Sequence, residues 1–498
     1  MDKKLQALAD RIVEALQRSG VSDPIVAAEQ FAILLFLRLL DRDDLQGSGP
    51  AARSAEIDPS VFTAQAARYR WREWRRLPSR ELASFVSNEV LPYMGSLEKE
   101  DSAVASFFRD AELSIASAEL VVVLIAMIDA LEVDRLDPEA AGAFMDRLLS
   151  GLGWQSKDGS LRTPAPLRRL MVGLVDARSG DLLIDPAMGT GGLLAEAALR
   201  SSRSDPFPTS DPKLHGIDQS RTLLRIATVN LALRGLPIDG LRRADALGDG
   251  EISPGRAPEG GYDVVLCDPP FGSMRSEEVH SGHEGFRTRR REALFLALTM
   301  RLLAPGGRAA IVLPEMLLSD TSGAHLDLRR TLVEEFDVLA VMELPAWGQH
   351  VRSATRFSLV TFRRPLVSAR RVSATWFCDL RMRSFRVAGG DANSYARGMD
   401  AALDDWAGFR DGGFATPPGI PAAAVLDHDA RTPRSWWAST DEIAGSGYRL
   451  DAARWAPVIS KWPLQDDPVR LAEQAIDDYR QLIDRLEALH GDLDAWTG

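Results

Sequence analysis

The sequence predicts an α/β fold, in which a doubly wound, mostly parallel, Rossmann-like sheet follows an all-helical N-terminal domain and precedes a helical C-terminal tail. Three observations support this prediction. Apolar residues recur at helical spacing over about the first 150 residues, and short β-rich runs alternate with helical stretches from about residue 165. Beyond residue 466, apolar side chains return near heptad intervals with charges between them.

The N-terminal part carries its apolar residues in helical patterns. Three stretches show this spacing, namely Leu5 to Leu16, Ala27 to Leu40 and Ser114 to Leu131. Such spacing places the apolar side chains of a helix on one face, which then packs against a core. We therefore assign residues 1–150 to a helical N-terminal domain.

The middle of the chain contains short runs of strand-forming residues. We expect strands over Leu182 to Ile184, Leu214 to Ile217, Asp263 to Cys267, Ala309 to Leu313 and Val338 to Leu344. Helical stretches separate these runs, and strands joined by helices pair in parallel. Residues 151–370 are therefore assigned to an α/β domain.

The last part of the chain divides into two segments. Residues 371–460 form a mixed, turn-rich segment, in which we expect the adjacent Trp436 and Trp437 to pack in the core. Residues 461–498 hold an amphipathic helix over Asp467 to Leu493.

The composition restricts the class of protein. With 45% hydrophobic and 26% charged residues, the 498-residue chain is a globular multidomain protein. No apolar run reaches the roughly 18 to 20 residues of a membrane span, and the N-terminus lacks the pattern of an export signal, so we expect a cytoplasmic location. Cys267 and Cys378 are expected to be reduced thiols, and the seven scattered histidines lead us to assign no metal.

The net charge of −12 has the wrong sign for a protein that binds nucleic acid through phosphate contacts alone. Binding to DNA would therefore need a partner or a local basic surface.

A glycine loop follows the first expected strand. It runs from Asp185 to Gly192 and precedes a helical stretch. Glycines allow a tight turn and a close approach of the backbone to a ligand at a helix N-terminus. The Asp185 carboxylate, at the tip of the strand, can attract the ammonium group of a methionine moiety. Short glycine loops also occur without any ligand, so this motif alone leaves the question open.

Two further acids stand at the ends of expected strands. Asp218 ends the run from Gly216, where its carboxylate can accept hydrogen bonds from a ribose diol. Asp245 is placed to accept a hydrogen bond from the amino group of an adenine ring in a cofactor. Acids at strand ends are frequent in other settings too, so these two count only together with the other motifs.

The most specific motif is Asp268-Pro269-Pro270-Phe271, which follows an apolar run. An exocyclic base amine is a poor nucleophile, because its lone pair is delocalised into the ring, and hydrogen-bond acceptors draw it toward a reactive geometry. The Asp268 carboxylate and the Pro269 carbonyl can each accept one amine hydrogen, while the two prolines stiffen the turn. Phe271 can stack on a base flipped out of a duplex. The alternative is an ordinary tight turn, which does not account for the order and spacing of all these motifs.

Taken together, the motifs resemble the modification subunit of type I restriction-modification systems, an N6-adenine DNA methylase family. The resemblance also rests on Thr163-Pro164 before a helix, on Asn230 to Gly235 and on Leu303 to Pro314, and it runs through most of the chain. It implies a methyltransferase sheet and methyl transfer from S-adenosyl-L-methionine to the N6 amine of adenine in DNA. The cofactor-binding residues that it implies are Thr163, Pro164, Asp185, Ala187, Gly189, Thr190, Gly191, Asp218 and Asp245. The catalytic residues that it implies are Asp268, Pro269, Pro270 and Phe271.

The chain departs from this family at two places. The family usually has Asn at the position of Asp268, and Cys or a similar small residue at the position of Met188. An aspartate at the first position occurs in other amino-methyltransferases, so we interpret the change as compatible with activity.

Some twenty residues beyond the Asp268 to Phe271 motif, which we call the catalytic loop, lie candidates for contacts to DNA phosphates. They are Arg287, Arg289, Arg290 and Arg291. The alternative is an exposed basic loop without that role. A second group either contacts DNA or forms a solvated helix face over buried tryptophans. This group comprises Arg68, Arg70, Trp71, Arg72, Trp74, Arg75 and Arg76.

The family resemblance implies partners, namely DNA, a separate specificity subunit and a restriction subunit. No helicase motif, nuclease motif or recognition module is evident in the sequence, which favours such a multisubunit arrangement. Three alternatives stay open: a solitary enzyme that acts on DNA, methylation of an RNA guanine or a protein glutamine, and an inactive scaffold that binds a partner.

Overall fold

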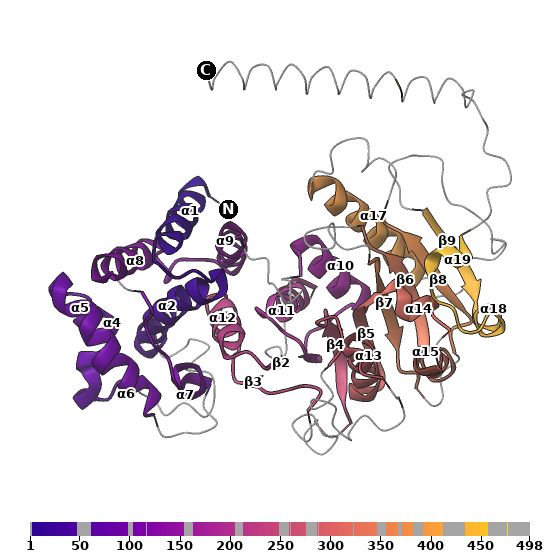
Figure 1. Cartoon of the computed structure of the whole chain (residues 1–498), viewed down its shortest axis with the longest axis horizontal. Helices are drawn as coiled ribbons and strands as arrows, with labels where there is room; N and C mark the ends of the chain where they lie inside the picture. Colours follow the sequence, from indigo (N-terminus) through magenta and orange to yellow (C-terminus); the bar gives the residue numbers. More distant parts are fainter. Residues whose placement is uncertain are drawn as a thin grey trace. The chain divides into compact units, whose positions relative to one another are not determined.

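The computed structural model of the chain describes residues 2–46, 61–97, 103–115, 117–153, 163–204, 213–248, 258, 260–274, 286, 288–321, 323–345, 355–366, 371–381, 392–411, 434–456 and 476. The chain divides into two compact units, Met1–Ala456 and Pro457–Gly498. The helix expected over 467–493 belongs to the second unit and lies outside the described residues, except for residue 476. Figure 1 labels the helices and strands of the first unit.

Among the described residues of the N-terminal part, all regular elements are helices, as predicted. Its elements are α1 Lys3–Gln17, α2 Pro24–Gln46, η1 Ala64–Tyr69, α4 Trp71–Trp74, α5 Ser79–Phe85, η2 Val86–Val90, α6 Leu91–Gly95, α7 Ala103–Phe108, α8 Ala118–Ala130 and α9 Pro138–Gly151. Polar caps fix the start of several helices. The Ser117 side chain accepts a hydrogen bond from the Leu120 amide at 3.2 Å, and that of Asp137 accepts one from Ala140 at 2.8 Å. Each cap satisfies an amide that a helix leaves unpaired at its first turn.

The described strands form one nine-stranded sheet in the order β3-β2-β1-β4-β5-β7-β6-β8-β9. Their bounds are β1 Leu182–Asp185, β2 Lys213–Asp218, β3 Leu241–Arg243, β4 Tyr262–Cys267, β5 Leu303–Pro314, β6 Asp337–Glu343, β7 Phe357–Arg363, β8 Ala374–Asp379 and β9 Arg434–Ser439. Strand β7 runs antiparallel to β5 and β6, and β9 antiparallel to β8, whereas the other neighbours are parallel. The predicted mostly parallel sheet is therefore confirmed.

The strand order reverses between β1 and β4. From β1 the chain moves outward to β2 and β3 and then returns to β4 on the other side of β1. In open α/β sheets, ligands bind in the crevice beside the carboxyl ends of the strands at such a reversal. Asp185 ends β1 and Asp268 directly follows β4, so the topology brings two predicted site residues to this edge.

Helices cover both faces of the sheet. They are α10 Ala165–Val175, α11 Gly192–Ser204, α12 Arg221–Ala232, α13 Arg291–Leu302, α14 Glu315–Ser319, α15 Gly323–Glu335, α17 Ala392–Asp411, α18 Thr440–Gly445 and α19 Ala452–Trp455. The first three and α17 share a core with the N-terminal helices, while the remainder pack on the other face. Alternate strand residues serve the two cores, as Leu183 and Ile184 do on β1.

The segment 371–460 takes part in the sheet. It contributes β8 and β9, so the sheet continues beyond residue 370. Trp436 and Trp437 lie on β9 and are buried, as expected, one in each core. The two cysteines, Cys267 on β4 and Cys378 on β8, are free and fully buried. Among the described residues, no helix has the length and apolar character needed to cross a membrane.

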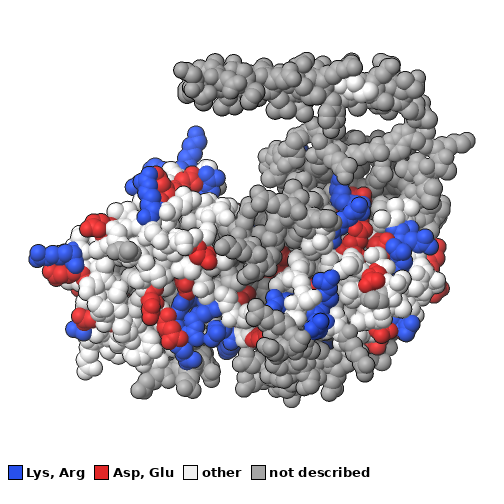
Figure 2. Space-filling view, in the orientation of Figure 1, with Lys and Arg blue, Asp and Glu red and all other residues white. Residues whose placement is uncertain are grey.

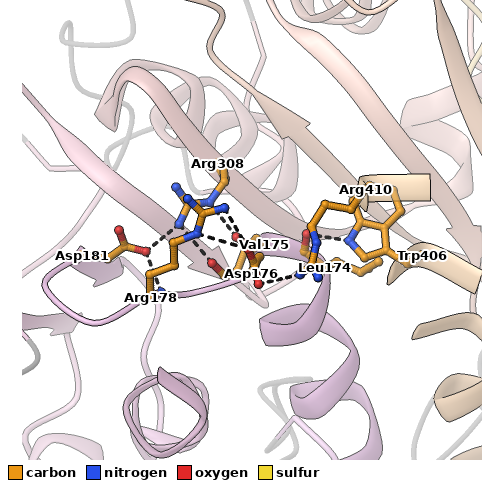
Figure 3. A network of polar contacts seen from close by, with 8 residues as sticks. All are labelled: Leu174, Val175, Asp176, Arg178, Asp181, Arg308, Trp406 and Arg410. Atoms are coloured by element: carbon orange, nitrogen blue, oxygen red, sulfur yellow. Dashed lines mark hydrogen bonds and ion pairs between the residues drawn. The ribbon is translucent and has the colours of Figure 1, made fainter. Parts of the chain in front are cut away.

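The C-terminal end of α10 is fixed by side chains from two distant elements (Figure 3). Arg308 of β5 donates from Nε to the Val175 carbonyl at 2.6 Å and forms an ion pair with Asp181 at 2.5 Å. From α17, Trp406 donates to the Leu174 carbonyl at 3.1 Å, and Arg410 pairs with Asp176 at 2.7 Å. These contacts satisfy carbonyls that would otherwise lack partners at the helix end. They anchor α10 to the sheet and to α17.

A buried ion pair joins the N-terminal helices to the α/β part. Arg225 of α12 pairs with Glu29 of α2, and both residues are buried. The Arg225 guanidinium also donates to the carbonyls of Phe107 at 2.8 Å and Arg109 at 2.7 Å, at the end of α7. Because the ion pair and the Phe107 hydrogen bond are buried, the contact is specific to one packing of α2 and α7 on α12.

Candidate functional site

The glycine loop between β1 and α11 is joined to the end of β2 by hydrogen bonds. The Gly189 amide donates to the Asp218 carboxylate at 3.1 Å, and the Met188 amide donates to the Ile217 carbonyl at 3.0 Å. Asp185 accepts a hydrogen bond from the Ala187 amide at 3.0 Å. The backbone of the loop is thereby held at the edge of the sheet where the strand order reverses.

The two central glycines of this loop have different surroundings. Gly189 has φ +53° and no atom of the described residues within 4 Å of the position where a Cβ would lie. At Gly191, with φ +71°, a Cβ would lie 2.7 Å from Leu231 Cδ1 and 3.2 Å from Ala227 Cβ of α12. Open space for a ligand therefore lies beside Gly189, whereas Gly191 is required for the packing of the loop on α12.

We expect Gly191→Val to destabilise the protein and Gly189→Asn to affect ligand binding alone. The valine adds left-handed strain and a collision with α12, which together cost about 2 kcal/mol or more. Asparagine tolerates a positive φ, so its side chain would enter the open space without unfolding the loop. Thermal unfolding and calorimetry with S-adenosylmethionine test the pair. A stable Gly191→Val protein, or undiminished cofactor affinity in Gly189→Asn, would contradict this division of roles.

Asp185 is buried at this edge and Asp218 is half-buried, and the pKa values of both are raised. Burial raises the pKa of Asp185 well above its usual range, and the nearby Asp268 and Asp218 raise it further. Burial also raises the pKa of Asp218 to about 6, against the hydrogen bonds from Ser220 and Gly189. A ligand that carries an ammonium group and a ribose diol would offset these desolvated carboxylates. This pair of carboxylate acceptors therefore fits S-adenosylmethionine.

The remaining predicted cofactor residues lie around the same loop. Thr190 is buried, and its carbonyl accepts a hydrogen bond from Asn230 of α12 at 2.8 Å. Asp245 is exposed beyond β3 and accepts the Leu247 amide at 3.0 Å. Ala244, just before it, donates to the Asp218 carbonyl at 3.1 Å, which places Asp245 beside the end of β2. Contacts of these residues with a cofactor stay predictions.

Asp268 lies at the carboxyl end of β4 and is bound by a residue distant in the sequence. Thr163 Oγ1 donates a hydrogen bond to Asp268 Oδ2 at 2.7 Å. Burial raises the pKa of Asp268 to about 6, while this hydrogen bond acts in the opposite direction. Pro164 is the N-cap residue of α10, so the Thr163-Pro164 motif begins that helix beside the catalytic loop. The structure thus places the Thr163 hydroxyl against a predicted catalytic group.

The predicted catalytic loop, residues 268–271, is held in place by contacts of Gly272 and Met274 with the start of α13 and the residues before it. The Gly272 amide donates to the carboxylate of Glu292, a buried residue, at 3.1 Å. The Gly272 carbonyl accepts the Arg291 amide at 2.9 Å, and the Met274 amide donates to the Arg289 carbonyl at 2.8 Å. The sequence offered no sign of the role of Glu292, because a lone acid in the first turn of a helix is common.

An aromatic pair stands beside this loop. The rings of Phe271 and Phe357 have centroids 4.4 Å apart and planes inclined at 44°. Phe357 begins β7 and pairs in register with Pro314 at the end of β5, so it comes from the same edge of the sheet. Phe271 remains partly exposed. It therefore offers a supported aromatic face next to the Asp268 carboxylate.

The structure gives the predicted basic residues different surroundings. Arg287 lies outside the described residues, whereas Arg289, Arg290 and Arg291 adjoin the catalytic loop through the backbone contacts of their segment. Of the second group, Arg70 pairs with Asp41 at 3.4 Å, and Trp71 and Trp74 are buried. Acidic and basic side chains are interspersed on the face in Figure 2, where the described residues form no broad surface of one sign.

Comparisons with known proteins identify the family of the chain. The family model described as N-6 DNA methylase matches residues 148–459. The type I restriction enzyme EcoEI methylase subunit of Escherichia coli is 25% identical over 344 residues, which are 66% of this chain and 68% of that subunit. The EcoKI methylase subunit of Escherichia coli strain K12 is 25% identical over 339 residues, which are 63% of this chain and 62% of its own length.

A solved structure shares the fold over nearly the whole chain. It comes from work on complex assembly and conformational transition of the type I restriction-modification system, and it aligns with a TM-score of 0.71 at 24% identity. The alignment covers 99% of this chain and 98% of that one. The family model spans more than half of the sequence and includes the glycine loop and the Asp268 motif. The chain belongs to the N-6 DNA methylase family.

Proposed function

We propose that this chain transfers a methyl group from S-adenosyl-L-methionine to the N6 amine of adenine in DNA, as the modification subunit of a restriction-modification or related defence complex. The observation that carries the proposal is the position of Asp268-Pro269-Pro270-Phe271 at the carboxyl end of β4, beside the glycine loop that follows β1. Family membership supports the same reaction. A DNA substrate implies action in the cytoplasm.

The cofactor would lie along the ends of β1 and β2. Asp185 would hold its ammonium group, Asp218 its ribose diol and Asp245 its adenine amine, with the backbone close to it at Gly189. When bound, S-adenosylmethionine supplies a methyl group on a positively charged sulfur. Asp185 and Asp218 would hold the two ends of this part of the cofactor and thereby orient it.

The target amine would be oriented by the catalytic loop. One oxygen of Asp268 and the Pro269 carbonyl would each accept an amine hydrogen, which localises the nitrogen lone pair on the side that faces the cofactor. Pro269 and Pro270 restrict the backbone of the loop, and the Glu292 contact at Gly272 fixes its far end. Phe271, supported by Phe357, would stack on the flipped adenine.

The proposal includes a separate specificity subunit, which would read the DNA sequence, and a restriction subunit. Two observations support a partner: the net charge of −12, and the near-heptad pattern over 467–493 of the sequence. The related subunits named above belong to type I restriction enzymes. The apolar stripe of the helix predicted over 467–493 needs a surface to cover it, and helices of another subunit would provide one.

The purified chain is expected to bind S-adenosylmethionine by itself but to methylate specific DNA sites only after the specificity subunit is added. Truncation after Asp466 should leave cofactor affinity intact and prevent co-purification with that subunit. Transfer of labelled methyl to duplex DNA, single-stranded DNA and RNA measures the substrate class. Site-specific methylation by the lone chain would contradict the need for a partner, and preferential labelling of RNA would contradict the proposed substrate.

A further inference from the structure

Asp268 has one restrained and one available carboxylate oxygen. Oδ2 accepts the hydrogen bond from Thr163 Oγ1 at 2.7 Å. Within the described residues, Oδ1 accepts no hydrogen bond, and Asp268 keeps part of its surface exposed. A hydroxyl that binds one oxygen fixes the rotation of the carboxylate, because the plane of the group then follows the position of the donor. The free oxygen is thereby presented at a defined place.

Thr163 is itself restrained by neighbours from two helices. Arg168 of α10 donates from Nη1 to the Thr163 carbonyl at 2.9 Å. The Arg168 side chain is buried and forms an ion pair at 2.7 Å with Asp146 of α9, in the N-terminal part. Pro164 also disfavours helical backbone at the residue before it. A continuous set of contacts therefore leads from α9 through Arg168 and Thr163 to Asp268.

We propose that Thr163 is a positioning residue for the catalytic carboxylate of Asp268, and that the N-terminal helices contribute to methyl transfer through Asp146 and Arg168. This inference rests on the proposed function. It gives Thr163 a role different from the cofactor contact that the family resemblance implies. The two roles lead to different experimental results.

The hydrogen bond from Thr163 also favours the ionised form of Asp268. A donor to a carboxylate stabilises the charged form, so its removal raises the pKa of that group. The acid that interacts with Asp268 across the sheet edge is Asp185 at the end of β1, which Asp218 at the end of β2 also influences. The neighbouring Cys267 thiol has its own pKa raised by burial and by the Asp185 and Asp268 carboxyl groups. No cation offsets the loss of the Thr163 donor among the groups that shift the pKa of Asp268.

Three variants test the role of the hydroxyl in the full chain assembled with its specificity subunit. Thr163→Val keeps the shape of the side chain and removes the donor, whereas Thr163→Ser keeps the donor. Thr299→Val is the matched control, because Thr299 is fully buried in α13 and its hydroxyl only donates to the Phe295 carbonyl of the same helix at 2.8 Å. Steady-state kinetics at several pH values and calorimetry with S-adenosylmethionine are measured for each.

We expect kcat of Thr163→Val to fall about tenfold or more, as for the loss of a hydrogen bond to a charged group. The pH at which its activity falls on the acid side of the pH–rate profile should move to a higher value, while its affinity for the cofactor stays that of the native chain. Thr163→Ser should keep the native kcat and the native pH–rate profile. Thr299→Val should also leave kcat and the pH–rate profile unchanged. A weaker cofactor affinity with an unmoved acid limb would overturn the positioning role and support the cofactor contact instead.

A second measurement separates this inference from the proposed function. Selective ¹³C labelling of aspartate carboxyl groups allows the pKa of Asp268 to be followed without turnover, with Asp268→Asn identifying its signal. Thr163→Val should raise that pKa, and Asp146→Asn should reduce kcat and shift the same signal in the same direction. An unchanged Asp268 titration in Thr163→Val would overturn the inference even in an active enzyme. A raised pKa would uphold the contact even if DNA proved not to be the substrate.

Discussion

Asp268→Ala should bind S-adenosylmethionine with native affinity and transfer methyl groups roughly a hundredfold to a thousandfold more slowly, the usual loss when a group that stabilises a transition state is removed. The Asp268 carboxylate meets the target amine in the proposed arrangement, whereas the cofactor is held by the ends of β1 and β2. Initial rates with labelled cofactor on DNA bound to the complex, together with calorimetry, measure the two effects. A fully active Asp268→Ala enzyme would remove the acceptor role from this residue.

Asp268→Asn supplies the matched comparison. The amide oxygen remains a hydrogen-bond acceptor, but the side chain no longer titrates. In the native chain the pKa of Asp268 lies at about 6, so activity that needs the carboxylate is present above that pH and is lost as the pH falls through it. The Asn variant should retain activity and lose this acid limb. If the Asn variant still lost activity as the pH fell, that loss would belong to another group, such as Asp218, whose pKa is also raised to about 6.

Arg225→Ala is expected to have the largest effect on stability. Removal of this guanidinium leaves Glu29 buried without its partner and takes one donor from the Phe107 carbonyl, while the Arg109 carbonyl keeps a hydrogen bond from Arg221 at 2.8 Å. Breaking a buried ion pair from one side costs about 3–5 kcal/mol. The loss should appear in a urea titration as a lower unfolding midpoint, and the packing of α2 on α12 should be lost first.

An exposed ion pair provides the control for this prediction. Arg147 of α9 pairs with Asp10 of α1 at 2.6 Å, and the side chains are 45% and 47% exposed. Arg147→Ala should leave the midpoint nearly unchanged, because exposed pairs contribute little. The double variant Arg225→Met with Glu29→Leu should be more stable than Arg225→Ala, since no charge then remains buried. Equal losses for Arg225→Ala and Arg147→Ala would refute the importance of the buried contact.

Runs of branched and apolar residues were sufficient to find five strands of the sheet. Each expected run, such as Leu214 to Ile217, lies within an observed strand or reaches one residue beyond it. A strand end was expected at Asp245, but the bounds of the short β3, Leu241–Arg243, were not predicted, because three residues with two exposed arginines show no apolar pattern. Strands β8 and β9 lie in the segment that the sequence left unassigned to the sheet. Their place depends on pairing with β6 and with each other across long stretches of chain.

The motifs located the site, but they did not supply its contacts. Asp185 and Asp268 were each predicted at or just after the end of a strand, and the structure brings them together because neighbouring parallel strands end at a common edge. The bond between Thr163 and Asp268 joins residues 105 positions apart, and side-chain orientation at such separation has no signature in one sequence. The same holds for Phe357, an apolar residue at the start of a strand, which looks like any core residue until its ring is seen beside Phe271.

The burial of the two cysteines has a practical consequence for later experiments. Cys267 and Cys378 are the chain's two cysteines, both fully buried, and burial together with nearby acids raises the pKa of each thiol well above its usual range. The thiolate is the form that reacts with maleimides, so neither native cysteine should be labelled while the protein is folded. A single cysteine introduced at an exposed position, for example in place of Val123, would carry a fluorophore or spin probe without replacement of any native thiol. The same reagent would register unfolding, because each molecule that opens reveals its native thiols.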